Sequence, residues 1–292
     1  MKDTTKKWVF LFVLAFIWGS SFILIKKSLT GLTPYQLGAL RTIISGLFLF
    51  SVGLKSLKSI KKEEWKWVVV SGFLGSFIPA FLFAIAETEI DSAITSILNS
   101  LVPLNAILLG FAIFKIGFTK RQFLGVIIGF IGTTILIFKG ADLNPDQNYL
   151  YAGFVIISTI MYALNVNIIK TYLQNVKPLS IATGNYVAIM IPAIAILVSS
   201  DFFSESTYFH PDFKMSMVYV VILSFFGTAL AKVLFTTLVQ ISTPVFASSV
   251  AYLMPIVALF WGFLDGEEFG FLQLVSSVII LFGVYLANKK KT

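Results

Sequence analysis

The sequence predicts an all-α membrane protein of ten transmembrane helices, arranged as two inverted five-helix repeats. Three observations lead to this prediction: the composition, ten long apolar runs, and an internal repeat. Of the 292 residues, 57% are hydrophobic and 12% are charged, whereas soluble domains average about 45 to 50% apolar and about 25% charged residues. A chain of this length has no core large enough to bury so much apolar surface. A water-soluble fold is therefore excluded, and lipid must solvate most of the chain.

Ten apolar runs are long enough to cross a bilayer. A hydrocarbon core of about 30 Å needs roughly 20 apolar residues in a helix. Short segments with turn residues connect the runs, and the longest connection is 199–214. The predicted spans are 8–25, 35–54, 65–86, 90–114, 122–138, 150–172, 179–198, 215–238, 244–264 and 269–288.

The basic residues sort by alternate loops, which predicts an orientation. One side of the membrane receives Lys2, Lys6, Lys7, Lys55, Lys58, Lys61, Lys62, Lys66, Lys115, Lys120, Arg121, Lys170, Lys177, Lys289, Lys290 and Lys291, and the other only Lys26, Lys27, Lys139 and Lys214. By the positive-inside rule both termini are cytoplasmic. The external loops then carry two groups of acids, Glu87, Glu89 and Asp91, and Asp265, Glu267 and Glu268. We expect these acids to be loop charges.

An internal repeat relates residues 8–139 to residues 149–288. An offset of 144 places Trp18 on Tyr162, and an offset of 152 places Gly75 on Gly227 and Pro103 on Pro255. Five spans per half is an odd number, so the two halves must enter the membrane from opposite sides. Inverted repeats allow two bundles to rock around a shared site near the middle of the membrane, as in secondary transporters. Duplication for folding alone is the alternative.

Several motifs of this chain resemble the EamA family of the drug/metabolite transporter superfamily. They are Trp18-Gly19-Ser20-Ser21-Phe22, Pro34 and Arg41, and a long match from Thr243 to Ala287 that includes Pro255, a Gly266-Glu267 turn and Gly283. In the first half, Lys115-Ile116 replaces the expected Gly-Glu turn. The resemblance covers nearly the whole chain and implies ten helices in two repeats. It also implies a site lined by spans one, three, four, six, eight and nine, and it favours export of amino acids or related metabolites.

Two ionisable residues lie within predicted spans and more than a helical turn from the span ends, where charge is costly and therefore a candidate for function. Lys232 in the eighth span is a candidate counter-ion for a substrate carboxylate or phosphate; the alternative is that its amine snorkels to the cytoplasmic interface. Arg41 in the second span either gates the outer mouth of the site or has a structural role. In the structural role it caps carbonyl groups or pairs with Glu87, Glu89 or Asp91.

Uncharged side chains within the spans complete the predicted substrate site. The polar candidates are Ser21, Asn99 and Asn165, and the aromatic candidates are Trp18, Tyr162 and Tyr252. Asn99 and Tyr252 each precede a proline that frees a backbone carbonyl and opens or kinks the helix. Hydrogen bonding between helices is the alternative role for the polar groups.

The sequence therefore predicts a secondary transporter, favouring an exporter, that moves small metabolites such as amino acids or related anionic compounds by alternating access. The alternative is a multi-pass membrane enzyme or a channel acting on lipid-linked or ionic substrates.

No Walker loop, metal-ligand cluster, catalytic triad or cysteine is present in the sequence, so we expect no enzymatic activity, no cofactor and no metal. The expected partners are a small-molecule substrate and a lipid bilayer, the bacterial cytoplasmic (inner) membrane, with no nucleic acid; a monomer and a homodimer both remain open. No carboxylate lies deep in a predicted span, which favours facilitated diffusion or coupling at the rim over a buried acidic proton relay.

Overall fold

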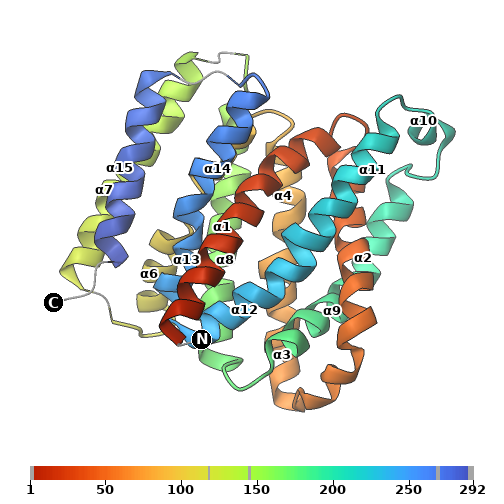
Figure 1. The fold of residues 1–292 in the computed structure, drawn as a ribbon, viewed down its shortest axis with the longest axis horizontal. Coiled ribbons are helices and arrows are strands. Elements are labelled where there is room, and N and C mark those ends of the chain that lie inside the picture. Colours follow the sequence, from red (N-terminus) through yellow and green to blue (C-terminus); the bar gives the residue numbers. More distant parts are fainter. Residues whose placement is uncertain (1–2, 118, 144–145, 268–269, 289–292) are drawn as a thin grey trace.

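A computed structural model describes residues 3–117, 119–143, 146–267 and 270–288 of the protein, and all regular elements in these ranges are helical. The predicted all-α fold is confirmed (Figure 1). In chain order the elements are α1 (Asp3–Ser28), α2 (Pro34–Gly53), η1 (Leu54–Ser59), α3 (Lys62–Gly72), η2 (Phe73–Phe77), α4 (Ile78–Ala86), α5 (Ser92–Asn99), α6 (Val102–Ala112), α7 (Lys120–Leu143), η3 (Tyr149–Tyr151), α8 (Ala152–Tyr172), α9 (Pro178–Ser199), α10 (Glu205–Tyr208), α11 (Phe213–Ile222), η4 (Leu223–Leu230), α12 (Ala231–Ile241), α13 (Pro244–Ser248), α14 (Val250–Leu264) and α15 (Phe271–Asn288).

Within the described residues, eight helical segments are long and apolar enough to cross a membrane. They are Thr5–Ser28, Pro34–Ser59, Lys62–Ala86, Ser92–Ala112, Tyr149–Tyr172, Pro178–Ser199, Phe213–Ile241 and Pro244–Leu264. The predicted spans at 122–138 and 269–288 coincide with α7 and α15, although residues 268 and 269 lie outside the described ranges. The chain is therefore an integral multi-pass membrane protein, whereas the count of ten spans and their inversion stay predictions.

Local sequence signals set where several helices begin. Proline occupies one of the first two positions of α2, α9 and α13, where its missing N–H is not needed. Thr33 and Gln36 form a reciprocal capping box at α2, and the Thr243 hydroxyl accepts from the Phe246 N–H at 3.2 Å. These caps satisfy backbone donors that otherwise have no partner at the membrane boundary.

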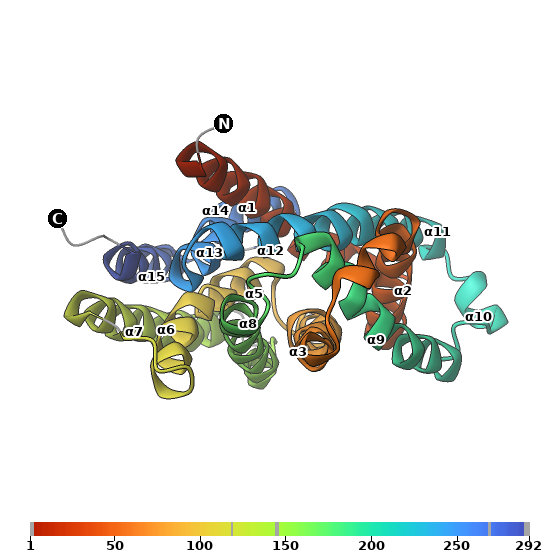
Figure 2. The same ribbon diagram turned by 90° about the horizontal axis from the view of Figure 1, so that it is seen from below.

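Helices of one half of the chain pack on helices of the other half. α2 packs on α9, and α7 packs on α15 at one side of the bundle (Figures 1 and 2). α1 packs on α12 and α14, while α8, its counterpart in the repeat, packs on α4 and α6. The repeat and the orientation of its halves stay predictions.

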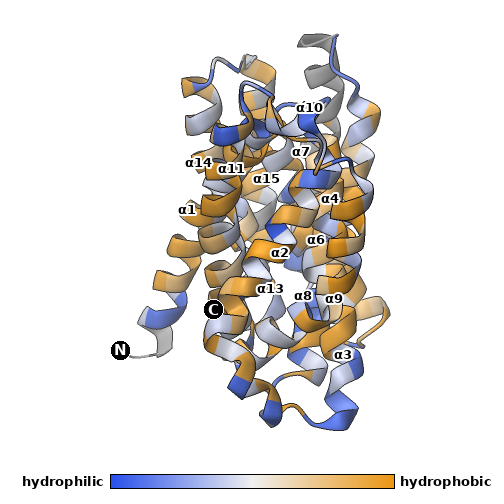
Figure 3. Ribbon diagram, turned by 90° about the vertical axis from the view of Figure 1, so that its right-hand side faces the viewer, coloured by the Kyte–Doolittle hydropathy of each residue, from blue (hydrophilic) through white to orange (hydrophobic). Residues whose placement is uncertain are grey.

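Polar residues gather toward the two ends of the bundle, and apolar residues cover much of its middle (Figure 3). Large side chains there are widely exposed, such as Ile191 at 77% and Phe16 at 61%, as expected where lipid replaces water. α1 begins and α15 ends toward the same end of the bundle (Figure 1). The opposite end carries the turns at 87–91 and 265–267 and is called the acidic end below; the charge pattern predicts that it is external.

Two predicted spans are each broken into two helices. The span predicted at 90–114 consists of α5 and α6, with the break at Ser100 and Leu101, and the span predicted at 244–264 breaks at Ser249 between α13 and α14. Pro103 follows the first break by two residues and cannot donate the backbone hydrogen bond that would continue α5. The first break therefore lies where the proline pattern predicts an opened or kinked helix, whereas Pro255 lies inside α14, six residues after the second break.

Replacement of Gly283 by alanine is expected to separate α7 from α15. A Cβ atom at this position would lie 2.6 Å from the Gly129 backbone nitrogen and 2.7 Å from the Gly125 carbonyl oxygen. Backbone atoms cannot move aside as a flexible side chain can, so overpacking should cost about 1 to 3 kcal/mol. Thermal unfolding in detergent measures the loss. Gly153→Ala on α8 is the matched control, because a Cβ atom there meets nothing within 4 Å; equal stability of the two variants would contradict the prediction.

Candidate functional site

A cavity of about 110 Å³ lies between the two halves of the chain. Side chains from α1, α5, α8, α12 and the two π-helical segments η2 and η4 line it, together with residues of α2, α9, α13 and α14. All six spans implied by the resemblance therefore contribute, and spans two and seven contribute as well. The cavity brings together Trp18, Ser21, Arg41, Asn99, Tyr162, Asn165 and Lys232. Their roles in substrate binding stay predictions.

Tyr252 is the one predicted substrate-binding residue that the structure places outside this lining. It belongs to a small apolar cluster with Ile97 of α5 and Ile280 of α15, and the side chain is buried. Ala251 and Met254 of the same helix line the cavity instead. Because successive helical residues are rotated by about 100°, a position next to a lining residue points to a different neighbour.

Lys232 presents its amine to the cavity wall. It is the second residue of α12 and only 6% exposed, so the amine does not snorkel to an interface. The Nζ atom donates to Ser76 Oγ at 3.1 Å and to the Gly75 carbonyl oxygen at 3.4 Å. None of the ion pairs found among the described residues includes Lys232. A buried ammonium group with only neutral, long hydrogen bonds has capacity left for an anion.

Two π-helical turns supply backbone carbonyl groups to the same wall. η2 and η4 fall at equivalent places of the two halves, since the offset of 152 moves Gly75 onto Gly227. Pro79 has no N–H to donate to Gly75, four residues earlier, and the Gly75 carbonyl faces Lys232. In η4 the Ala231 N–H bonds to Phe226 and Thr228 rather than to Gly227, and the Gly227 carbonyl accepts from Trp18 Nε1 at 2.8 Å. π-helical turns of this kind are common at functional sites.

The two glycines also meet equivalent residues of the opposite half. A Cβ atom at Gly75 would collide with the Asn165 amide, and one at Gly227 would lie 2.6 Å from Ser21 Oγ. Ser21 and Asn165 are themselves related by the offset of 144. Asn165 Oδ1 accepts from Ser71 Oγ at 2.6 Å, so its orientation is fixed. The absence of a Cβ atom therefore lets two polar side chains approach the π-helical turns on both sides of the cavity.

Arg41 lies on the cavity wall, and its predicted pairing with Glu87, Glu89 or Asp91 is wrong. Its Nε atom donates to Thr228 Oγ1 at 2.8 Å, and none of the ion pairs among the described residues involves it. The reason is the packing of α2 against η4, which brings Thr228 to the guanidinium group before any acid. The gating or structural role predicted for Arg41 stays a prediction.

Several cavity residues were not predicted from the sequence, among them the polar residues Ser76, Tyr186 and Thr228. Pro79 is the signal that points to the first, because a proline inside an apolar helix marks the turn before it as irregular. Tyr186 is 1% exposed and Thr228 is only a single hydroxyl in a long apolar span. Neither of these two carries a signal that separates it from ordinary helix packing.

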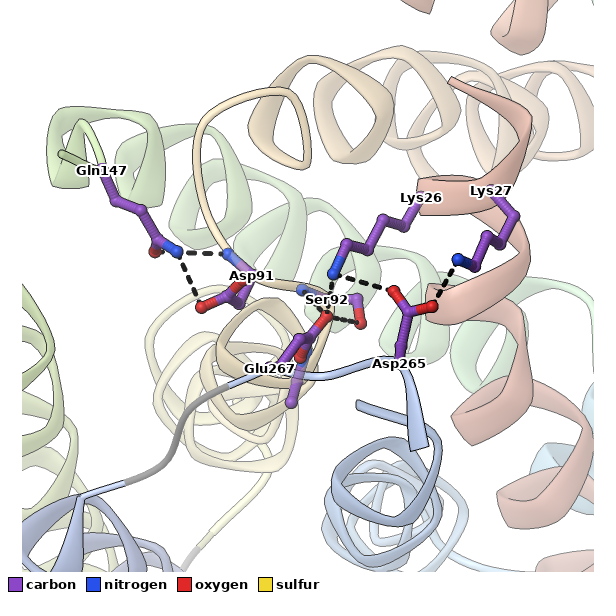
Figure 4. Close-up of polar contacts among 8 residues, drawn as sticks. Lys26, Lys27, Asp91, Ser92, Gln147, Asp265 and Glu267 are labelled. Carbon is purple, nitrogen blue, oxygen red and sulfur yellow. Dashed lines mark hydrogen bonds and ion pairs between the residues drawn. The ribbon is translucent and has the colours of Figure 1, made fainter. Parts of the chain in front are cut away.

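A network of charges joins three elements at the acidic end of the bundle (Figure 4). Lys26 of α1 binds Glu267 at 2.8 Å and Asp265 at 3.0 Å, and Lys27 binds Asp265. Glu267 also accepts from Ser92 Oγ at 2.7 Å and from the backbone N–H groups of Ser92 and Ala93 at 3.3 and 3.2 Å. It thus caps the N-terminus of α5, where a carboxylate is favourable.

The prediction that the acids of this end are loop charges is wrong for Glu87 and Glu267, which are 7% and 8% exposed. Glu267 turns inward because the N–H groups at the start of α5 donate to it and the Lys26 ammonium group of α1 pairs with it. Burial would raise the pKa of Asp265, but hydrogen bonds from Lys27 and Lys26 lower it below its usual value. Glu268 lies outside the described residues.

Asp91 lies at the same end, but its pKa is raised rather than lowered. Burial raises its pKa, the charge of Glu267 adds to the rise, and a hydrogen bond from the Gln147 amide at 2.7 Å acts against it (Figure 4). The acidic end therefore holds carboxylates in two different electrostatic environments: hydrogen bonds from two ammonium groups lower the pKa of Asp265, whereas burial outweighs the opposing charge of Lys26 at Asp91.

Comparisons with known proteins show the family and the fold of this chain. The model of the EamA-like transporter family matches residues 6–138 and 150–289. An Archaeoglobus fulgidus protein named as an uncharacterized transporter is 26% identical, covering 98% of this chain and its own full length. The Escherichia coli inner membrane transporter YedA, also named as uncharacterized, is 24% identical and covers 96% of this chain and 90% of itself. A solved structure with 16% identity has the same fold, with a TM-score of 0.69 over 97% of both chains.

Proposed function

Because the chain belongs to the EamA-like transporter family, we propose that it is a secondary transporter that moves small organic anions through the cavity by alternating access. One observation supports the substrate class: the lining of the cavity contains the two cations Arg41 and Lys232 and no carboxylate among the described residues. A substrate carboxylate or phosphate would supply a negative partner for the Lys232 ammonium group, which takes part in none of the ion pairs found among the described residues. Amino acids and related metabolites carry such a group.

The rest of the wall suits the remainder of a small metabolite. Trp18 and Phe235 pack with ring centroids 5.0 Å apart, and Tyr162 stacks on Phe83 at 5.9 Å. These rings form an apolar surface for a carbon skeleton, while Asn99 and the π-helical carbonyls are acceptors for an amine.

Counterflow in proteoliposomes tests the transport proposal. Vesicles loaded with unlabelled amino acids, sugar phosphates or uncharged drugs are presented with the labelled compound outside. We expect saturable counterflow for at least one carboxylate or phosphate and none for uncharged analogues. Flux that neither saturates nor shows counterflow would indicate the channel alternative, and chemical conversion of the compound would indicate an enzyme.

We further propose that both termini are cytoplasmic and that export is the main direction in a bacterial cytoplasmic membrane, as the basic loops support. The sequence contains no cysteine, so single-cysteine variants give unambiguous labelling. Lys115→Cys and His210→Cys are exposed positions in loops at opposite ends of the bundle. In intact cells we expect a membrane-impermeant maleimide to label position 210 and not position 115. Labelling of both, or of position 115 alone, would contradict the orientation.

A further inference from the structure

Glu87 is a buried acid that neither the helix packing nor the cavity explains. It is the first residue after α4, one turn beyond Phe83, which lines the cavity. The side chain is 7% exposed, and both carboxylate oxygens are inaccessible and lack a hydrogen-bond partner of normal geometry. An ionised carboxylate in such a position loses its hydration and gains no hydrogen bond of normal geometry in return.

The charged neighbours of Glu87 already have other partners. α1 contributes Lys26, which binds Glu267 and Asp265, and α2 contributes Arg41, which binds Thr228. The turn after α14 contributes Glu267 and Asp265, the turn of Glu87 itself contributes Glu89 and Asp91, and α8 contributes the uncharged Tyr162, which stacks on Phe83. Lys26, Lys27, Asp265 and Glu267 form a set of two cations and two anions. This set is neutral without Glu87.

We propose that Glu87 is a proton-binding site that holds its proton while Lys26 is bound to Glu267 and releases it when this ion pair separates during transport. The O–H bond of the carboxyl group breaks, water at the acidic end accepts the proton, and the freed ammonium group of Lys26 becomes available to the new carboxylate. The coupling of this step to substrate movement rests on the proposed function, whereas the presence of the proton does not. Proton release at the acidic end would then couple transport at the rim, which the sequence analysis favours over a buried acidic proton relay.

The electrostatics of the turn agree with a bound proton. Burial raises the pKa of Glu87 well above its usual range, and the negative charge of Glu267 adds to the rise. The charges of Arg41 and Lys26 and the backbone N–H of Lys26 act in the opposite direction with smaller effect. Lys26 lies close to both acids, so its movement away from Glu267 and toward Glu87 would reverse which of the two is stabilised as an anion.

The stability of Glu87→Gln as a function of pH tests the proton site without any substrate. An acid with a raised pKa binds more protons in the folded than in the unfolded protein, so stability falls as pH rises from the unfolded pKa through the folded one. Glutamine resembles the protonated acid and does not titrate. We therefore expect the melting temperature of Glu87→Gln to match the wild type at low pH and to exceed it increasingly as pH rises. Glu89→Gln, in the same turn and more exposed, should follow the wild type.

A variant that is less stable than the wild type at neutral pH would show that Glu87 is ionised, and would overturn the proposal. If Glu87→Gln does not fold, infrared spectroscopy of the wild type decides the question. A carbonyl stretch of a protonated carboxyl group must then persist at neutral pH in purified protein, and its absence would overturn the proposal equally.

Proteoliposomes test the coupling with whichever anion shows counterflow. Glu87→Gln should keep substrate exchange and lose the acceleration that a pH gradient gives the wild type, whereas Glu89→Gln should keep both. Wild-type transport that ignores a pH gradient would overturn the coupling. If no compound is transported at all, the proposed function fails, and the stability measurement still decides whether Glu87 holds a proton.

Discussion

Replacement of Lys232 by methionine is expected to weaken the binding of an anionic substrate by roughly 10- to 100-fold. A hydrogen bond to a charged group is worth about 1.5 to 3 kcal/mol, and each 1.4 kcal/mol or so is a factor of ten in affinity. Methionine is unbranched and of similar length, so the packing of α12 should persist. The concentration for half-maximal counterflow measures the effect.

The same substitution should raise the melting temperature of the protein. Lys232 is 6% exposed and its amine has only two neutral partners, so its removal relieves the cost of a buried charge. Loss of transport together with a gain in stability distinguishes a binding residue from a structural one.

Two control variants define the test of Lys232. Lys232→Arg keeps the positive charge and should retain part of the substrate affinity, whereas Lys214→Met removes an exposed lysine and should change nothing. If Lys232→Met inserts normally and binds its anionic substrate with wild-type affinity, the counter-ion hypothesis is wrong. The cavity would then need another explanation for its two unmatched cations.

Replacement of Glu267 by alanine is expected to lower the free energy of unfolding by about 3 kcal/mol. The change removes one acceptor of the Lys26 ammonium group and leaves the N–H groups of Ser92 and Ala93 at the start of α5 without a partner. Breaking a buried ion pair typically costs about 3 to 5 kcal/mol, and loss of a helix cap costs about 0.5 to 2 kcal/mol. Asp265 still binds Lys26, which reduces the first of these costs.

Thermal unfolding in one fixed detergent measures the loss at Glu267. Glu89→Ala is the control, since this acid is only partly buried and makes no ion pair among those found in the described chain. Glu267→Gln should lie between the wild type and Glu267→Ala, because its amide oxygen can still accept one hydrogen bond but has lost the attraction to Lys26. Equal melting temperatures for all these proteins would show that the network at the acidic end is solvated and contributes nothing.

Local sequence properties determined a large part of the fold. Composition and the length of apolar runs predicted the membrane environment and the positions of the helices, because each helix satisfies its own backbone in lipid. Pro34 and Pro178 are the first residues of α2 and α9, and Thr243 caps α13, because capping depends on a few adjacent residues. The repeat placed Trp18 and Tyr162 at equivalent positions, and both lie on the cavity wall.

Only the tertiary structure decided how side chains are paired between helices. Thr228 rather than an acid meets Arg41, Tyr252 turns toward α15, and Glu87 is buried without a partner. Each outcome depends on the rotation of a helix about its axis and on contacts between residues far apart in sequence. An apolar helix in lipid carries little amphipathic signal to fix that rotation, since lipid-facing and core-facing residues are equally apolar. The sequence by itself determined a membrane-embedded helical protein of a transporter family, and packing decided which polar groups face its cavity.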